Sequence, residues 1–432
     1  MCRSRKSADA IQPTTSAAAA AAAAARPSKS SRTSKSYHSS NPSNPSSSSS
    51  ASLNLNSYSY NSNSSSLSAG QQSLSRIKQF LPETPLIYTL PDLRLATGNF
   101  LAGRLSSSSW RCALRGRDAV VFQRRLKRPL DAPQLARRLS AITKSHHSSL
   151  VKVLGAAVAG NFVYLAYEFV EGANLSDCLR NKVNRAFTVL SSWVTRMQIA
   201  ADLAHGLDYI HHCAGSATGA GGGSGFVHNH IKSSSIIVTE PSLNARICQF
   251  GTADLCGEAA EVVEEEEEGA SEPGSGPTLK RTSSRGVKLE GTRGYMSPEY
   301  LVTGVATQKS DVFAFGVVIL ELLSGEEPLR YCFDGEDGGG GYRRMSVIDS
   351  AREAVEGGKV RRWVDLRLKD SYPEEVAERM VSLGLECVEE EAERRPDMSQ
   401  VSALISKLYL DSKAWAEKFG LPVDFSVSMA PR

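Results

Sequence analysis

Two short segments near the middle of the chain carry residue types that could move a proton. Residues 228–235 read H-N-H-I-K-S-S-S, so that His230, Lys232 and Ser235 lie close together. Residues 249–251 follow as Q-F-G. A histidine can serve as a general base near neutral pH. Neither segment contains a carboxylate, the group with which proteins most often hold magnesium. The two segments therefore offer a base without the ligands of a metal centre.

Two helices are predicted to support these segments. Between Met197 and His211, apolar residues recur at helical spacing, which predicts a helix with one apolar stripe. Residues 317–323 read V-V-I-L-E-L-L and predict a helix that is buried on all sides. The chain is long enough to bury a sizeable core around them.

Composition excludes several function classes. The chain of 432 residues carries 50 Lys and Arg against 46 Asp and Glu, and this balance is too mild to indicate nucleic-acid binding. Eight cysteines are scattered without a C-x-x-C pair, which argues against zinc and against a secreted disulfide framework. No apolar run approaches the ~20 residues that a membrane span needs. We therefore expect no nucleic acid, no metal and no transmembrane span.

Residues 1–87 differ in composition from the rest of the chain. They are rich in Ser, Asn and Ala, and no acidic residue lies between Asp9 and Glu83. Such a stretch buries too little apolar surface to offset its ordering entropy, so we expect a disordered arm. Cys2 beside basic residues is a candidate for S-acylation and hence for peripheral membrane contact. A basic, serine-rich start is also typical of transit peptides, so organelle targeting stays as an alternative.

Three motifs in the second half of the chain carry a resemblance to a known family. Residues 291–300 read G-T-R-G-Y-M-S-P-E-Y, residues 309–318 read K-S-D-V-F-A-F-G-V-V, and residues 393–398 read E-R-R-P-D-M. From about residue 88 to 410 the chain resembles the kinase domain of plant receptor-like kinases of the Pelle type. The sequences of these motifs are most similar to those of the LysM-type members. Neither a signal peptide nor LysM repeats precede this region, so the resemblance implies a receptor-like cytoplasmic member.

The resemblance implies the bilobal α+β fold of protein kinases. A small β-rich N-lobe is expected over residues 88–172 and a large helical C-lobe over residues 173–412, with a tail over residues 413–432.

The resemblance also implies structural roles for residues of the C-lobe. Glu299 is expected to pair with Arg395, and because a buried bidentate pair is costly to break, its retention indicates an ordered lobe. Asp311 is expected to accept backbone N–H bonds from the catalytic loop. His228 and Phe250 match the apolar spine that ties the lobes together, and Gly251 matches the hinge beside it.

The catalytic positions of the family are degraded in this chain. Phosphoryl transfer depends on positioning and charge neutralisation, for which kinases use H-R-D-x-K-x-x-N, D-F-G, a strand lysine and a helix glutamate. Lys232 is retained. The other catalytic positions are replaced. His230 stands in place of the catalytic Asp, Ser235 in place of the metal-binding Asn, and Gln249 in place of the D-F-G Asp. Gln123 stands in place of the strand lysine, and Arg138 in place of the helix glutamate. We therefore interpret His230 as structural or vestigial and expect an inactive site.

The nucleotide pocket is altered less evenly. Ser106, Ser108 and Arg111 stand at the three positions of the glycine-rich loop, where side chains would obstruct the approach of phosphates. The positions beside adenine stay small and apolar, and the hinge keeps its pattern. The expected pocket consists of Ala113, Val121, Tyr167, Glu168, Phe169 and Val170. ATP is therefore possible as a ligand without magnesium, and no cofactor is certain.

Two insertions depart from the family. Residues 215–225, almost all Gly, Ala and Ser, predict a flexible linker. The activation segment carries an acidic run at residues 264–268 and then basic-flanked candidate phosphorylation sites at Thr282, Ser283 and Ser284. Asn229, however, replaces the arginine that reads an activation-loop phosphate in regulated kinases.

Three functions remain open from the sequence. The first is a pseudokinase that acts as scaffold or allosteric partner of an active receptor-like kinase. The second is a weak or unconventional ATP-dependent Ser/Thr kinase that uses His230 and Lys232. The third is a sensor that binds a nucleotide without catalysis. In each case we expect a cytoplasmic protein, with the periphery of the plasma membrane as a candidate location.

Overall fold

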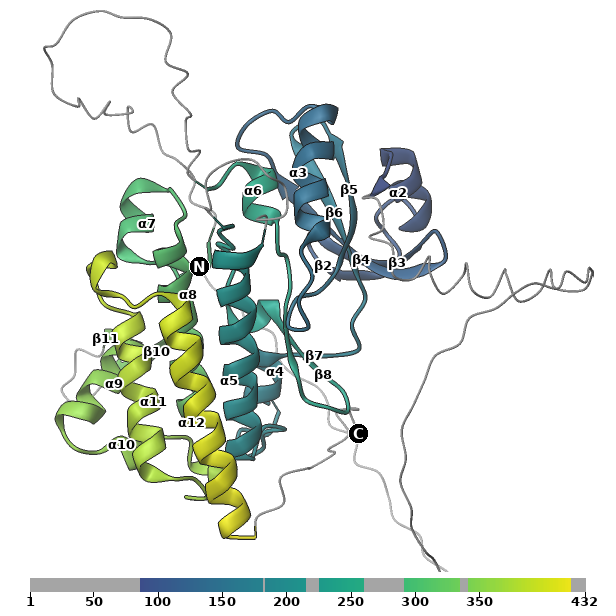
Figure 1. The fold of residues 1–432 in the computed structure, drawn as a ribbon. Helices are drawn as coiled ribbons and strands as arrows, with labels where there is room; N and C mark the ends of the chain where they lie inside the picture. The colour runs from purple at the N-terminus through teal and green to yellow at the C-terminus, as the bar shows by residue number, and fades with distance from the viewer. Residues whose placement is uncertain (1–85, 182, 215–224, 260–290, 335–340, 421–432) are drawn as a thin grey trace, which may run out of the picture. The chain divides into compact units, whose positions relative to one another are not determined.

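The computed structural model describes residues 86–181, 183–214, 225–259, 291–334 and 341–420, all within one compact unit of the chain (Figure 1). Several features named above lie outside the described residues. These are the arm before residue 86 with Cys2, residues 215–224 of the linker, the acidic run, and Thr282, Ser283 and Ser284.

The N-terminal part of this unit is a sheet with a helix on each face. Six strands are ordered β1-β5-β6-β4-β3-β2, and only the β1–β5 pair is parallel. Apolar residues of α3 (Ala132–Lys144) pack on one face, and Leu93 of α2 (Leu90–Ala96) packs on the other. The strands are β1 (Leu86–Ile87), β2 (Arg104–Ser106), β3 (Ser109–Leu114), β4 (Arg117–Arg125), β5 (Val153–Ala159) and β6 (Phe162–Glu168).

Helix α3 forms where local signals favour it. Asp131 caps its N-terminus: its carboxylate accepts a bond from the Gln134 backbone N–H, while the Gln134 side chain accepts one from the Asp131 backbone N–H. Leu135, Leu139 and Ile142 recur at i, i+4 and i+7 and are all buried. This stripe fixes which face of α3 meets the sheet.

The C-terminal part is built from long helices (Figure 1). Helix α5 (Trp193–Asp208) packs along α12 (Met398–Lys418), and α8 (Gln308–Ser324) packs against α11 (Glu374–Cys387). Burial of α8 on all sides is confirmed. Burial of α5 extends well beyond the single stripe expected, because several helices surround it. Within the described residues, no helix is both long and apolar enough to cross a bilayer.

Shorter elements complete the fold. Three strands form a small sheet in the order β7-β8-β9, and β10 pairs with β11 in a separate hairpin. The remaining elements are α4 (Leu175–Leu179), α6 (Thr252–Cys256), α7 (Pro298–Thr303), α9 (Val347–Glu356), α10 (Val360–Trp363), β7 (Gly172–Asn174), β8 (Ile236–Thr239), β9 (Ala245–Ile247), β10 (Leu329–Asp334) and β11 (Gly341–Ser346).

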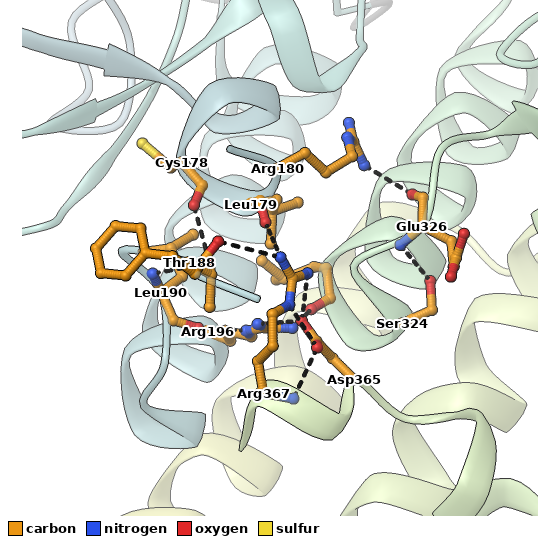
Figure 2. A network of polar contacts seen from close by, with 12 residues as sticks. Cys178, Leu179, Arg180, Thr188, Leu190, Arg196, Ser324, Glu326, Asp365 and Arg367 are labelled. Atoms are coloured by element: carbon orange, nitrogen blue, oxygen red, sulfur yellow. Dashed lines mark hydrogen bonds and ion pairs between the residues drawn. The ribbon is translucent and has the colours of Figure 1, made fainter. Parts of the chain in front are cut away.

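A buried polar network ties α5 to the segment after α10 (Figure 2). The guanidinium of Arg196 is fully buried and donates to Asp365 at 2.5 Å and to the carbonyl oxygens of Leu190 and Leu322, each at 2.7 Å. Arg367 donates to both oxygens of Asp365, at 2.8 and 2.7 Å. Because each buried charge has several partners, the network carries no uncompensated charge.

The observed elements differ from the expected domain boundaries. Strand β1 begins at Leu86 and pairs with β5, so the sheet already includes residues assigned to the arm. Strand β7 spans the expected boundary at residue 172 and pairs with β8 of the second part. Helix α12 runs past residue 412 to Lys418, because its apolar face continues to Ala416.

Candidate functional site

The segment 228–235 is held against the start of α8. Asp311 accepts bonds from the backbone N–H groups of His228 and Asn229, each at 2.7 Å, and lies 3.1 Å from Nε2 of His211. The capping box of Thr307 and Ser310 fixes the first turn of α8 and hence the position of Asp311. His228 is fully buried, and this burial lowers the pKa of its imidazole to about 4. The role expected for Asp311 corresponds to these contacts.

His230 lies beside a carboxylate that sequence reasoning missed. Its Nε2 is 2.9 Å from Oε2 of Glu258, a residue that is 3% exposed and follows α6. Asn229 donates to the same oxygen at 2.8 Å. Burial by itself would raise the pKa of Glu258, but its close contact with His230 and the hydrogen bond from the Asn229 amide lower it to about 2. His230 therefore belongs to a buried pair. A vestigial residue would make no such contact, so the structural interpretation of His230 fits better.

Glu258 also fixes the start of the activation segment. Its backbone N–H donates to the Ala253 carbonyl oxygen, and its own carbonyl oxygen accepts from Ala306 before α8. The amide of Asn229 contacts the Tyr300 hydroxyl in addition to Glu258. Asn229, which stands at the position expected for the phosphate-reading arginine, thus binds a carboxylate of this chain.

The register of β4 differs from the one expected. Tyr164 and Val121 belong to the core cluster on the α2 face, and Gln123 donates to the Tyr164 hydroxyl at 3.1 Å on that same face. Arg124 lies on the opposite face, where its Nη2 donates to Oε1 of Gln249 at 2.5 Å. Arg124, and not Gln123, therefore takes the position expected for the strand lysine.

A shift of one residue explains the whole difference. Side chains alternate between the two faces of a strand, so moving the register by one exchanges every residue between them. Residues 120–122 read V-V-F, an apolar run before Gln123 that does not distinguish the faces. The pairing of Phe122 with Leu165 and of Gln123 with Tyr164 fixes the outcome.

The shift also changes the expected adenine slot. Phe122 now lies on the cleft face, with its ring edge-on to Tyr167 and the ring centroids 5.7 Å apart. Val121 is buried on the far face and does not line the cleft. Arg111, opposite Val120 on the cleft face, places its guanidinium 3.6 Å from the centroid of the Phe169 ring. A large side chain and a stacked cation therefore lie where small apolar residues were expected.

The other expected pocket residues are only partly in place. Ala113 is exposed at the β3–β4 turn and lies opposite Asp118. The Glu168 carboxylate pairs with Arg246 at 3.1 Å. Val170 is half-buried just beyond β6.

The loop between β2 and β3 is a tight turn closed by serines. The hydroxyls of Ser106 and Ser109 lie 2.6 Å apart, and the backbone N–H of Ser108 donates to the Ser106 hydroxyl at 3.3 Å. The loop's polar groups are thus bonded to one another, which leaves the serines little freedom to bind a phosphate.

The residues after β9 bind the N-terminal sheet and α3 closely. The Tyr167 hydroxyl donates to the Phe250 carbonyl oxygen at 2.9 Å, and Arg138 of α3 donates to that of Asp254 at 2.7 Å. Gly251 has φ +83°, and a Cβ added there would lie 2.7 Å from the side chain of Ile142. Glycine is therefore required on both conformational and steric grounds.

The remaining catalytic-loop positions are used by the loop itself. The Ser235 hydroxyl lies 2.6 Å from the His230 carbonyl oxygen and 2.9 Å from that of Lys232, so it closes the turn. Lys232 Nζ donates to the Thr292 hydroxyl at 3.0 Å. Within the part of the chain that the structure describes, no cluster of His, Cys, Asp and Glu is arranged to hold a metal ion.

Glu299 and Arg395 form a bidentate pair. The two nitrogen–oxygen distances are 2.7 and 2.8 Å, and Arg395 also donates to the carbonyl oxygens of Lys309 and Glu389. The Arg395 side chain is fully buried, whereas that of Glu299 is 26% exposed. The pair therefore anchors α7 to the segment before α12.

Comparison with known proteins identifies the family. Residues 120–404 match the protein kinase domain model. The LysM domain receptor-like kinase 3 of Arabidopsis thaliana is 30% identical over 77% of this chain and 48% of its own length, so the chain spans about half of that relative. The probable receptor-like protein kinase At2g47060 of the same plant is 31% identical over 66% of this chain and 68% of its own length.

A solved structure supports the same assignment. The pseudokinase domain of BIR2, described as an immune regulator of the RLK/Pelle family, superimposes with a TM-score of 0.52 at 25% identity, covering 77% of this chain and 87% of that one. The β-rich and helical parts are thus the two lobes of a kinase fold, as the motifs predicted. This chain belongs to the protein kinase family, in its receptor-like kinase branch.

Proposed function

We propose that this chain is a pseudokinase that acts by binding, as a scaffold or allosteric partner of an active receptor-like kinase. The observation that carries the proposal is the state of the three positions where phosphoryl transfer needs an acid or a metal ligand. Gln249 is bonded to Arg124, His230 is paired with Glu258, and Ser235 closes its own loop. Each group has a contact within the protein that competes with catalysis.

The magnitudes favour this proposal over a weak kinase. A positioned base contributes about 10²- to 10⁴-fold to a rate. Removal of charge stabilisation at a phosphoryl-transfer site costs about 10³ to 10⁵. Nε2 of His230 faces Glu258, so only the other ring nitrogen is left to accept a proton, and a base there would still act without metal-bound oxygens. Base catalysis by His230 therefore does not compensate for what Gln249 and Ser235 lack.

The adenine slot argues against a nucleotide sensor. Phe122 and the Arg111–Phe169 stack occupy the region that would receive the base. A nucleotide would have to displace packed aromatic groups, and the binding energy spent on that displacement is lost from its affinity. We therefore place the ATP-sensing function below the binding function.

The surface around residues 291–303 keeps the sequence pattern of the family and exposes apolar side chains to a partner. On α7, Val302 is 86% exposed and Leu301 is 49% exposed, beside the half-buried Glu299 anchor. Exposed apolar residues on a rigid, anchored element are typical of protein interaction sites. The likeness to a pseudokinase described as an immune regulator supports the same class of role. We propose a cytoplasmic location, at or near the plasma membrane, where such a partner would reside.

A binding assay with purified components tests the proposal. Full-length chain is immobilised and offered a purified active receptor-like kinase domain, with Val302→Glu as the interface variant. Leu410→Glu on α12, where Leu410 is 63% exposed, is the matched control. We expect capture by wild type and by Leu410→Glu, and loss of capture by Val302→Glu. Equal capture by all three would remove α7 from the interface, and no capture by any of them would contradict the scaffold role.

A further inference from the structure

One cavity of about 380 Å³ adjoins the catalytic loop and is lined by C-lobe residues together with Arg124 of the N-lobe. Its lining includes Arg124 from β4, Lys232 and Asn229 from the catalytic loop, and Thr292 and Ser297 from the segment before α7. These residues come from both lobes and from widely separated parts of the sequence. The cavity is therefore a product of the fold, and no single motif defines it.

Two cations converge on this cavity. Lys232 and Arg124 are both half-buried and both line it. Burial lowers the pKa of the Lys232 ammonium, and the positive charge of Arg124 lowers it further. Like charges held close together in a partly buried site destabilise each other until an anion lies between them.

The carboxylates nearby do not neutralise these two cations. Asp311 lines the cavity, but its oxygens accept bonds from two backbone N–H groups and lie beside His211. Glu258 binds His230 and Asn229 and is not part of the lining. Gln249, which replaces the Asp of the D-F-G motif, presents a neutral amide to Arg124. Counting the described residues, the cavity therefore carries an excess of positive charge.

Polar groups around the cations suit an anion with several oxygens. Lys232 has three donor positions, of which Thr292 accepts one at 3.0 Å. The hydroxyl-bearing residues Thr292 and Ser297 also line the space. Arg and Lys together with hydroxyl donors are the groups that proteins use to bind phosphate.

Resting on the proposed function, we infer that this cavity binds the phosphate group of a phosphorylated side chain on a protein partner, without a metal ion. Arg124 and Lys232 contact the phosphate oxygens, and Thr292 orients the Lys232 ammonium. The hinge residues Tyr167 and Phe169 are not part of the lining, so a ligand in this cavity needs no base. Gly291 and Thr292 at its rim are exposed within the part of the chain that the structure describes, as the approach of an extended segment requires.

The test measures peptide affinity in the presence of a chelator. A fluorescent phosphoserine peptide and its unphosphorylated form are titrated against the full-length chain in EDTA, by anisotropy. Wild type should prefer the phosphorylated form, and each of Lys232→Met and Arg124→Met should weaken its binding by at least about tenfold, the loss of one charged hydrogen bond. Lys232→Arg should keep most of the affinity. Arg128→Met, on the exposed loop before α3, is the matched control and should bind as wild type does.

Competitors distinguish the sources of phosphate. Inorganic phosphate should displace the peptide at high concentration, and ATP in EDTA should compete no better than inorganic phosphate. If ATP competes far better, the site recognises a nucleotide and the inference is wrong. Equal binding of both peptide forms, or unchanged binding by Lys232→Met in a variant that melts as wild type does, also overturns it.

These failures are separate from a failure of the proposed function. Loss of phosphopeptide selectivity without phosphate transfer would leave the pseudokinase proposal intact. Metal-dependent transfer to an acceptor would contradict the proposed function whatever the peptide affinity.

Discussion

Replacing Glu258 by glutamine should destabilise the domain in a pH-dependent way. Glu258 has its pKa lowered from 4.5 to about 2, because His230 and Asn229 outweigh the effect of burial. At about 1.36 kcal/mol per pKa unit, a shift of this size corresponds to about 3 kcal/mol of folding free energy. Since the folded pKa is depressed, this contribution is present above pH 4.5 and is lost as the pH falls toward 2.

Urea unfolding of the full-length chain measures the effect. Wild type should exceed Glu258→Gln by about 3 kcal/mol at pH 7, and the difference should shrink below pH 4.5. His230→Ala should also destabilise, and the double variant should lose less than the sum of the two single variants, because the pair shares one interaction. Glu356→Gln, at an exposed site on α9, is the control. Additive losses, or a difference that stays constant down to pH 3, would refute the pairing.

Four further substitutions test three separate parts of the structure. Arg395→Ala should cost about 3 to 5 kcal/mol and Glu299→Gln clearly less, because Arg395 is buried and Glu299 is partly exposed; equal urea midpoints would contradict this. Arg196→Met should cost a similar 3 to 5 kcal/mol by leaving Asp365 without one buried partner, and a neutral effect in the same melt would place the network at the surface. Phe122→Ala should let ATP raise the melting temperature, with about 2.7 kcal/mol of stabilisation at a hundredfold excess of ATP over Kd. The wild-type protein should not respond to ATP. A response by the wild-type protein would show that Phe122 does not fill the adenine slot.

Sequence reasoning recovered the parts of the fold that specific motifs encode. Residues 291–300 and 309–318 keep the wording of the family, and the residues they contain, including Glu299 and Asp311, make the contacts described above. These positions are informative because each one needs a carboxylate. Glu299 pairs with Arg395, and Asp311 accepts bonds from two backbone N–H groups. A motif that depends on such groups can be read without a structure.

The register of β4 could not be read in the same way. Residues 120–122 are apolar and Gln123 is polar. In each of the two possible registers of β4, apolar side chains face the core, so the sequence does not favour one register. The choice is made by tertiary contacts, since Gln123 finds the Tyr164 hydroxyl and Arg124 finds Gln249 from another part of the chain. Composition and spacing carry no record of these partners.

Glu258 was missed for a different reason. It is one of several acids between residues 258 and 268, and acidic runs are usually solvated. Only the fold brings this single carboxylate to His230 and Asn229 and buries it. The one available signal was its position shortly after Q-F-G, where the chain must still lie close to the catalytic loop.

The central claim is that the site has lost phosphoryl transfer, and a single-turnover assay tests it most directly. Purified full-length chain is mixed with labelled ATP, magnesium and an acceptor peptide, in parallel with His230→Ala. We predict that both proteins transfer no phosphate above the background of a chain-free control, because Gln249 and Ser235 supply no metal ligands and a base at His230 does not compensate for their absence. Metal-dependent transfer by wild type that is abolished in His230→Ala would contradict the claim.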